Sequence, residues 1–174
     1  MIQRCSIWKV FREFLNNPDQ KMHVRQISKK VGLAPTSVKL HIGTLLKEGM
    51  IREDDSGIFK GYLAQFDNGE FRFYKRINIL LSLQESGLIE FLDTSFTPSS
   101  IVLFGSAAKG EDTSTRDIDI FIESSEKKVD VSLYEKKMNR KIQLFASPHF
   151  HSLPKELRNN IANGIKLEGY LKVY

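Results

Sequence analysis

The stretch IVLFGSAAKGEDTSTRDIDIFIE, residues 101–123, contains two apolar runs joined by a polar connector. The first run ends at Gly105 and Ser106, and the second carries two carboxylates, Asp117 and Asp119, one residue apart. Alternate residues of a strand share a face, so these two carboxylates should point the same way. Such a like-charged pair does not help folding, but it suits a divalent cation with oxygen ligands. A Gly-Ser pair can turn the backbone and offer donors to a phosphate, so the stretch predicts a site for a metal-bound polyphosphate.

This stretch resembles the nucleotidyltransferase superfamily in its minimal prokaryotic form. The resemblance lies in a Gly-Ser pair, a small and a basic residue before a second glycine, and an Asp-apolar-Asp segment, here Gly105, Ser106, Ala108, Lys109, Gly110, Asp117 and Asp119. It implies that Asp117 and Asp119 are catalytic residues that bind Mg²⁺. It also implies that Gly105, Ser106 and Lys109 bind a nucleoside triphosphate. The alternative is a hairpin with a polar loop and an incidental pair of aspartates.

The family uses a third carboxylate, on a later strand, as a metal ligand and as the base for the attacking hydroxyl. The matching strand is predicted at residues 141–145, after a helix at 129–139, and its expected acidic position holds Gln143. An amide carries no charge and cannot accept a proton near pH 7. Glu123 shares a strand face with the aspartate pair but lies too far along the strand to substitute. Arg116 also stands where the family usually has serine, and both departures count against catalysis but not against nucleotide binding.

The composition is that of a soluble globular protein. The chain has 174 residues, of which 41% are hydrophobic and 27% charged, and this length allows two modest cores. No apolar run approaches the ~20 residues of a membrane span, and the N-terminal segment has no signal-peptide core. Cys5 is the single cysteine, which suits a reducing compartment. We therefore expect a cytoplasmic protein with no membrane partner.

The N-terminal part of the chain is basic. Residues 1–47 hold nine lysines and arginines against two acidic residues, and nucleic acid is the commonest partner of such a module. Apolar periodicity predicts three helices and then the two strands of a hairpin, at 7–15, 24–31, 35–48, 50–52 and 58–63. An Asp-Asp-Ser-Gly turn joins the strands at 54–57. The segment 24–51 resembles the winged helix-turn-helix family of prokaryotic regulators.

In that family the third helix enters the major groove of DNA. The outward face of the third helix should carry Thr36, Lys39, Leu40, Gly43 and Lys47. Lys39 and Lys47 are predicted phosphate contacts, and Thr36 and Ser37 are placed to reach base edges or phosphates. Further basic residues should neutralise the flanking backbone, namely Lys60, Arg25, Lys29 and Lys30. The alternative is a protein-interaction or dimerisation module, because four acidic residues lie near the hairpin: Glu48, Glu53, Asp54 and Asp55.

These patterns predict an α+β protein in three parts. Residues 1–69 form a winged helix-turn-helix DNA-binding domain with three helices and a β-hairpin wing, and residues 70–97 form a helical linker. Residues 98–174 form a minimal nucleotidyltransferase-like domain, a small mixed β-sheet with flanking helices. Its tail, NGIKLEGY at 163–170, is similar to a pattern that accompanies the family's terminal helix, so a helix is expected there.

The predicted function is that of a DNA-binding regulator whose second domain binds Mg²⁺ with a nucleoside triphosphate and transfers nucleotide weakly or not at all. The alternative is an active nucleotidyltransferase that modifies a hydroxyl of a protein or small molecule. By analogy with the family, its protein partner would be of the toxin type. No arginine on the outward face of the third helix offers bidentate base contacts, so we expect the sequence preference to be weak or to be carried by a homodimer.

Overall fold

A computed structural model describes residues 5–56 and 59–174 and divides the chain into two compact units, with the boundary between Asn78 and Ile79. Helix α4 (Gly69–Ser86) contains this boundary and covers most of the segment 70–97 that was predicted as a helical linker. No helix in the described ranges is both long and apolar enough to cross a membrane.

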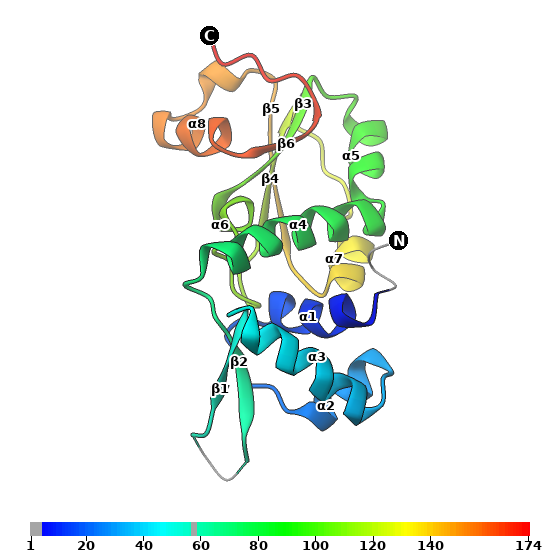
Figure 1. Ribbon diagram of the computed structural model, residues 1–174. Coiled ribbons are helices and arrows are strands. Elements are labelled where there is room, and N and C mark those ends of the chain that lie inside the picture. Colours follow the sequence, from blue (N-terminus) through cyan, green and yellow to red (C-terminus); the bar gives the residue numbers. More distant parts are fainter. Residues whose placement is uncertain (1–4, 57–58) are drawn as a thin grey trace. The chain divides into compact units, whose positions relative to one another are not determined.

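The N-terminal unit contains three helices followed by a two-stranded antiparallel sheet, in the order predicted from the sequence (Figure 1). The elements are α1 (Ser6–Asn16), α2 (Val24–Val31), α3 (Pro35–Lys47), β1 (Ile51–Asp54) and β2 (Gly61–Ala64). Pro35 takes the first position of α3, where its missing N–H costs no intrahelical bond. The second strand begins later than predicted, and the predicted turn residue Gly57 and strand residue Ile58 lie outside the described residues.

The core of this unit joins the apolar faces of the helices, as their periodicity predicts. Buried residues are Val10, Phe14 and Leu15 of α1, Ile27 of α2, and Val38, Ile42 and Leu45 of α3. The first half of α4 belongs to the same core, because the ring of Phe11 contacts those of Phe71 and Tyr74 edge to face. Lys75 is buried there and donates a hydrogen bond from Nζ to the carbonyl of Leu15 at 3.1 Å.

The C-terminal unit is built on a four-stranded mixed sheet with strand order β5-β4-β3-β6. Its strands are β3 (Ser100–Phe104), β4 (Ile118–Glu123), β5 (Ile142–Ser147) and β6 (Ile165–Gly169). Strand β3 pairs antiparallel with β4 and β6, and β4 pairs parallel with β5. The helical segments after α4 are α5 (Leu88–Phe96), α6 (Gly105–Lys109), α7 (Ser132–Met138), η2 (Phe150–Ser152) and α8 (Lys155–Ala162).

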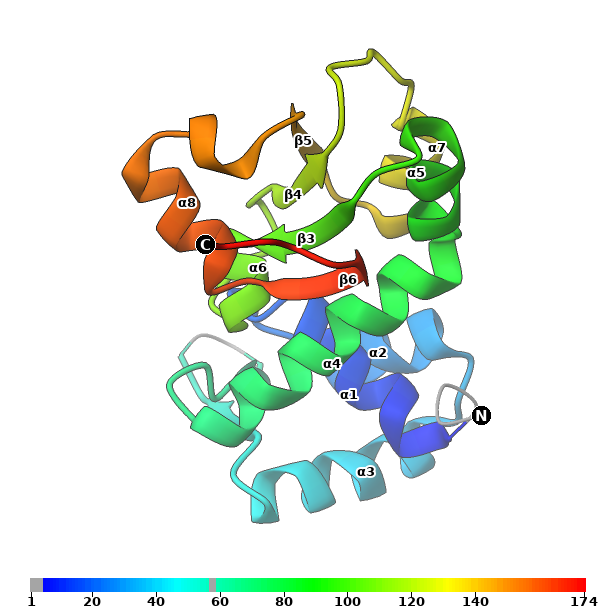
Figure 2. The same ribbon diagram turned by 90° about the horizontal axis from the view of Figure 1, so that it is seen from above.

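Both faces of the sheet are covered, and Figure 2 shows α8 on one side and α5 with α7 on the other. Ile118, Ile120 and Ile122 are fully buried on the face that packs against α5, α7 and the end of α4, as the alternation predicts. The opposite face buries Phe104 and Phe121 against Phe150 and α8. Asp119 lies on this second face, at the end of the sheet near α6.

Two sequence predictions for this unit are wrong in detail. The segment expected as a terminal helix at 163–170 forms strand β6, in which half-buried Ile165 and Leu167 alternate with exposed residues. At Gly169 a Cβ atom would collide with the carbonyl of Ser99, so the strand packs closely here. Helix α7 begins at Ser132 rather than 129, because the side chain of Asp130 accepts the N–H of Ser132 at 2.9 Å and turns the chain first.

Candidate functional site

The Gly-Ser pair follows the end of β3 and lies beside Asp119 of β4. Phe104 is directly opposite Asp119 in the antiparallel register, so Gly105 follows immediately beside it. Gly105 has φ +72°, a conformation that favours glycine, and a Cβ there would collide with Oδ2 of Asp119 and lie 3.3 Å from its Cγ. Glycine is therefore required here both for backbone conformation and for the close approach of the carboxylate.

The two aspartates form a like-charged pair at this end of the sheet. Asp119 is partly buried, and burial, followed by the charge of Asp117, raises the pKa of its carboxyl group. Asp117 is exposed and precedes the first residue of β4. Neither carboxylate has a salt bridge within residues 5–56 and 59–174.

This like-charged pair, neither member of which forms a salt bridge among the described residues, fits the hard-oxygen preference of a divalent cation. The pair has no third protein ligand beside it: in the described part of the chain, no group of three or more His, Cys, Asp or Glu side chains could hold a metal ion. Magnesium commonly binds through one or two carboxylates together with substrate phosphates.

Gln143 occupies the position beside Asp119 on the next strand. Strand β5 runs parallel to β4 with Gln143 paired to Asp119, so the two side chains share a face of the sheet. Gln143 is exposed. Glu123 lies at the other end of β4, where its carboxylate accepts bonds from Ser100 Oγ at 3.3 Å and from the N–H of Phe150 at 3.4 Å. Its contacts are therefore structural.

The connector before Asp117 is fixed by an ion pair that no local sequence pattern predicts. Arg140 donates from Nη1 to Oδ2 of Asp112 at 2.7 Å, and from Nε to the carbonyl of Arg116 at 2.7 Å. Both partners of the ion pair are largely buried, with side-chain exposures of 11% and 5%. We call Arg140, Asp112 and the Arg116 carbonyl the connector clamp. It holds the residue that precedes Asp117, and no local sequence signal links its members.

The other predicted nucleotide-binding residues lie on or next to α6. Ser106 is half-buried in the first turn of this helix, and its carbonyl accepts the N–H of Glu111 at 2.9 Å. Lys109 is exposed in the last turn, before Gly110 ends the helix with φ +71°. The structure thus brings Gly105, Asp119 and Gln143 together, whereas Lys109 has no ion pair with either aspartate.

The residues predicted to contact DNA lie on α3 and the hairpin. Thr36, Lys39, Leu40 and Lys47 are exposed on α3, with Leu40 at 70% exposure, and Ser37 is half-buried. Lys60 forms an ion pair with Glu53 at 2.7 Å, which raises the pKa of the lysine, and Lys30 pairs with Glu13 at 3.2 Å. These two lysines are partly neutralised, so Lys39 and Lys47 are the stronger candidates.

Comparison with known protein families finds a match to the nucleotidyltransferase domain over residues 85–163. The matched segment begins at the end of α4 and includes β3, β4 and β5. It contains every residue of the candidate nucleotide site, and none of the predicted DNA contacts. No curated protein and no solved structure matches the chain. The C-terminal unit therefore contains a nucleotidyltransferase domain, which implies a nucleoside triphosphate as its ligand, and such domains generally use divalent metals such as Mg²⁺.

Proposed function

We propose that the C-terminal unit binds a nucleoside triphosphate with Mg²⁺ at the end of β3 and β4. The observation that carries this proposal is the packing of Gly105 against the carboxylate of Asp119, with Asp117 close enough to raise the pKa of Asp119. A conformation that only glycine tolerates well, placed beside a like-charged pair, is a costly arrangement for stability alone.

Each residue has a distinct role in this proposal. Asp117 and Asp119 supply the carboxylate oxygens that hold the metal, and Gly105 and Ser106 offer donors to the terminal phosphates. Exposed Lys109 adds positive charge near the phosphates. When bound, Mg²⁺ neutralises charge on the phosphates and on the leaving pyrophosphate. The connector clamp keeps Asp117 in place for this purpose.

Transfer of the nucleotide by this site should be weak or absent. The attacking hydroxyl needs a base, and the side chain that shares the face of Asp119 on β5 is the amide of Gln143. The second candidate function, an active nucleotidyltransferase acting on a protein or small-molecule hydroxyl, is favoured by the intact pair Asp117 and Asp119. A toxin-type protein partner belongs to this second candidate and rests on analogy with the family.

Calorimetry with ATP, GTP, CTP and UTP, with and without Mg²⁺, tests the binding proposal. We expect Mg²⁺-dependent binding that Asp117→Ala or Asp119→Ala abolishes, because each change removes a hard anionic ligand. Asp93→Ala on α5 is the matched control, since it removes an exposed carboxylate of the same unit outside the site. If none of the four nucleotides binds at millimolar concentration, the site has lost this function.

The Gln143→Asp variant separates the two candidate functions. A carboxylate there would restore a base beside Asp119, and general-base assistance is worth roughly 10²–10⁴-fold in rate. We expect wild-type protein to transfer label from [α-³²P]ATP slowly or not at all, and the variant to gain transfer or tighter Mg²⁺ binding. Rapid transfer by the wild type would mean that another residue supplies the base.

We further propose that the N-terminal unit is a winged helix that binds DNA through α3, which would make the protein a transcription regulator whose sequence preference is weak or is carried by a homodimer. Lys39 and Lys47 support this proposal, because both are exposed and neither has an ion pair among the described residues. Gel retardation of DNA by the full chain should weaken steeply as salt is added. Bound lysines release counterions from the DNA, and this release becomes less favourable at higher salt.

Variants on α3 give the DNA proposal a sharper test. Lys39→Ala should weaken binding to all sequences about equally, whereas changes at Thr36 or Ser37 should alter sequence preference. Lys128→Ala, an exposed lysine of the C-terminal unit, is the control. If the chain retards no DNA even at low salt, the protein-interaction alternative for this unit is the better one.

A further inference from the structure

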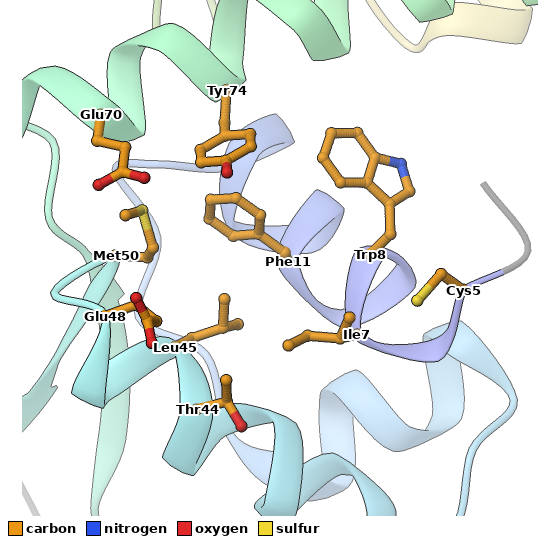
Figure 3. Close-up of a pocket in the computed structure, with 10 residues that line it drawn as sticks. All are labelled: Cys5, Ile7, Trp8, Phe11, Thr44, Leu45, Glu48, Met50, Glu70 and Tyr74. Carbon is orange, nitrogen blue, oxygen red and sulfur yellow. The ribbon is translucent and has the colours of Figure 1, made fainter. Parts of the chain in front are cut away.

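The N-terminal unit contains a cavity of 390 Å³ between α1, α3 and the start of α4. Figure 3 shows its lining, which is mostly apolar and aromatic: Cys5, Ile7, Trp8, Phe11, Thr44, Leu45, Glu48, Met50, Glu70 and Tyr74. This volume lies within the range of small-molecule sites, which combine an apolar wall with a few polar groups. The cavity is separate from the nucleotide site, because all its lining residues belong to the N-terminal unit.

The two carboxylates of the cavity lie at the same end. In Figure 3, Glu48 and Glu70 lie on the left, and Trp8 and Cys5 lie on the right, with the rings of Phe11 and Tyr74 between them. Glu48 and Glu70 are exposed, and neither has a salt bridge with any residue that the structure describes. One end of the cavity therefore carries two carboxylates that form no ion pair among the described residues.

The aromatic wall adds to this preference for positive charge. The Phe11 and Tyr74 rings meet edge to face with centroids 5.4 Å apart, and Trp8 contacts both, at 6.1 Å and 6.5 Å. Faces of aromatic rings attract cations, and the attraction grows when the cation leaves water. A ligand that fits must therefore be apolar or aromatic along its body and cationic at the end near the glutamates.

We propose that this cavity is a binding site for an organic amine with an aromatic or aliphatic body, whose ammonium group pairs with Glu48 and Glu70. Three lining residues, Thr44, Leu45 and Glu48, lie at the end of α3. Occupancy of the cavity therefore changes the surroundings of the helix that carries Lys39 and Lys47. This regulatory consequence rests on the DNA-binding function proposed above, whereas the binding itself does not.

Tryptophan fluorescence tests the binding directly, because Trp8 is the single tryptophan of the chain and lines the cavity. The probes are 4-phenylbutylamine and 4-phenylbutyrate, which share an apolar body and differ in charge. We expect the amine to change the Trp8 emission and to bind about tenfold tighter than the carboxylate, a ratio that corresponds to about 1.4 kcal/mol. Equal affinities, or no change in emission with either probe, would overturn the proposal.

Two variants and one control locate the site. The double variant Glu48→Gln/Glu70→Gln should remove the preference for the amine, whereas Glu90→Gln, an exposed glutamate on α5, should keep it. Thr44→Phe should fill the cavity from its exposed side and abolish binding without lowering the unfolding temperature. Unchanged amine binding in both variants would also refute the site. DNA retardation with and without the amine then tests regulation. If the amine does not change DNA retardation, the regulatory consequence is refuted, whereas the binding shown by fluorescence is not affected.

Discussion

Replacing Gly105 by alanine tests whether the close approach of the glycine to Asp119 serves ligand binding. Gly105 has φ +72°, and an L residue with a Cβ in this conformation costs roughly 1–2 kcal/mol. The new methyl group would also collide with Oδ2 of Asp119. Since this oxygen is at the free end of a side chain, the carboxylate can rotate away from the methyl group. The collision should therefore change the position of the carboxylate in the site more than it changes the free energy of unfolding.

Gly87→Ala isolates the backbone contribution. Gly87 belongs to the same unit and has φ +80°, but a Cβ there would meet no atom within 4 Å. Both variants should therefore lose a similar free energy of unfolding, roughly 1–2 kcal/mol, in urea denaturation. Only Gly105→Ala should also lose affinity for Mg²⁺ and ATP, by about tenfold or more, because a rotated Asp119 no longer offers its oxygen to the metal.

Calorimetry of the two variants beside the wild type is the assay. The decisive comparison is between the changes in stability and in affinity. If Gly105→Ala binds nucleotide as the wild type does while it loses the same stability as Gly87→Ala, then the glycine serves the turn alone. The role assigned to its contact with Asp119 would then be wrong.

Two further predictions concern stability. Arg140→Leu should destabilise the C-terminal unit by about 3–5 kcal/mol in chemical denaturation, because it breaks a largely buried ion pair. The double variant Arg140→Leu/Asp112→Leu should recover part of this loss, and a double variant less stable than Arg140→Leu would contradict this account. Hydrogen bonds from Ser56 and the neighbouring Lys21 lower the pKa of Asp54 to about 2, so the stability it adds is complete above about pH 4 and is lost as the pH falls towards 2. Asp54→Asn should therefore lower the unfolding temperature at pH 7, and this difference should shrink as the pH falls towards 2 and below. A constant difference across this range would contradict the assigned cause.

Local patterns were sufficient to predict much of this fold. Helix α2 has the predicted bounds, because its apolar residues keep helical spacing and Gly32 follows in the left-handed conformation. Alternation along β4 correctly separated the buried isoleucines from the face of Asp119. The position of Gln143 beside Asp119 was expected from the family resemblance, and the parallel register of β4 and β5 pairs the two residues.

Features that depend on distant parts of the chain were not predicted. Arg140 and Asp112 are 28 residues apart in sequence, and neither position carries a pattern that pairs it with the other. The ion pair of Lys60 with Glu53 depends on how the hairpin strands meet, and it weakens a predicted DNA contact. Strand β6 was predicted as a helix from the similarity of residues 163–170 to a family pattern. The alternation of Ile165 and Leu167, which is typical of a strand, indicates the observed structure.

The position of β5 at one edge of the four-stranded sheet has a consequence for aggregation. Its sequence, IQLFAS, has no charge, proline or glycine, and an apolar edge strand of this kind is a template for association with other chains. Lys141 and Pro148 flank it directly, as residues that limit such association often do. We therefore expect partial unfolding of the C-terminal unit to lead to aggregation through β5. The Gln143→Asp change, which places a charge within this strand, should reduce that aggregation whatever its effect on nucleotide transfer.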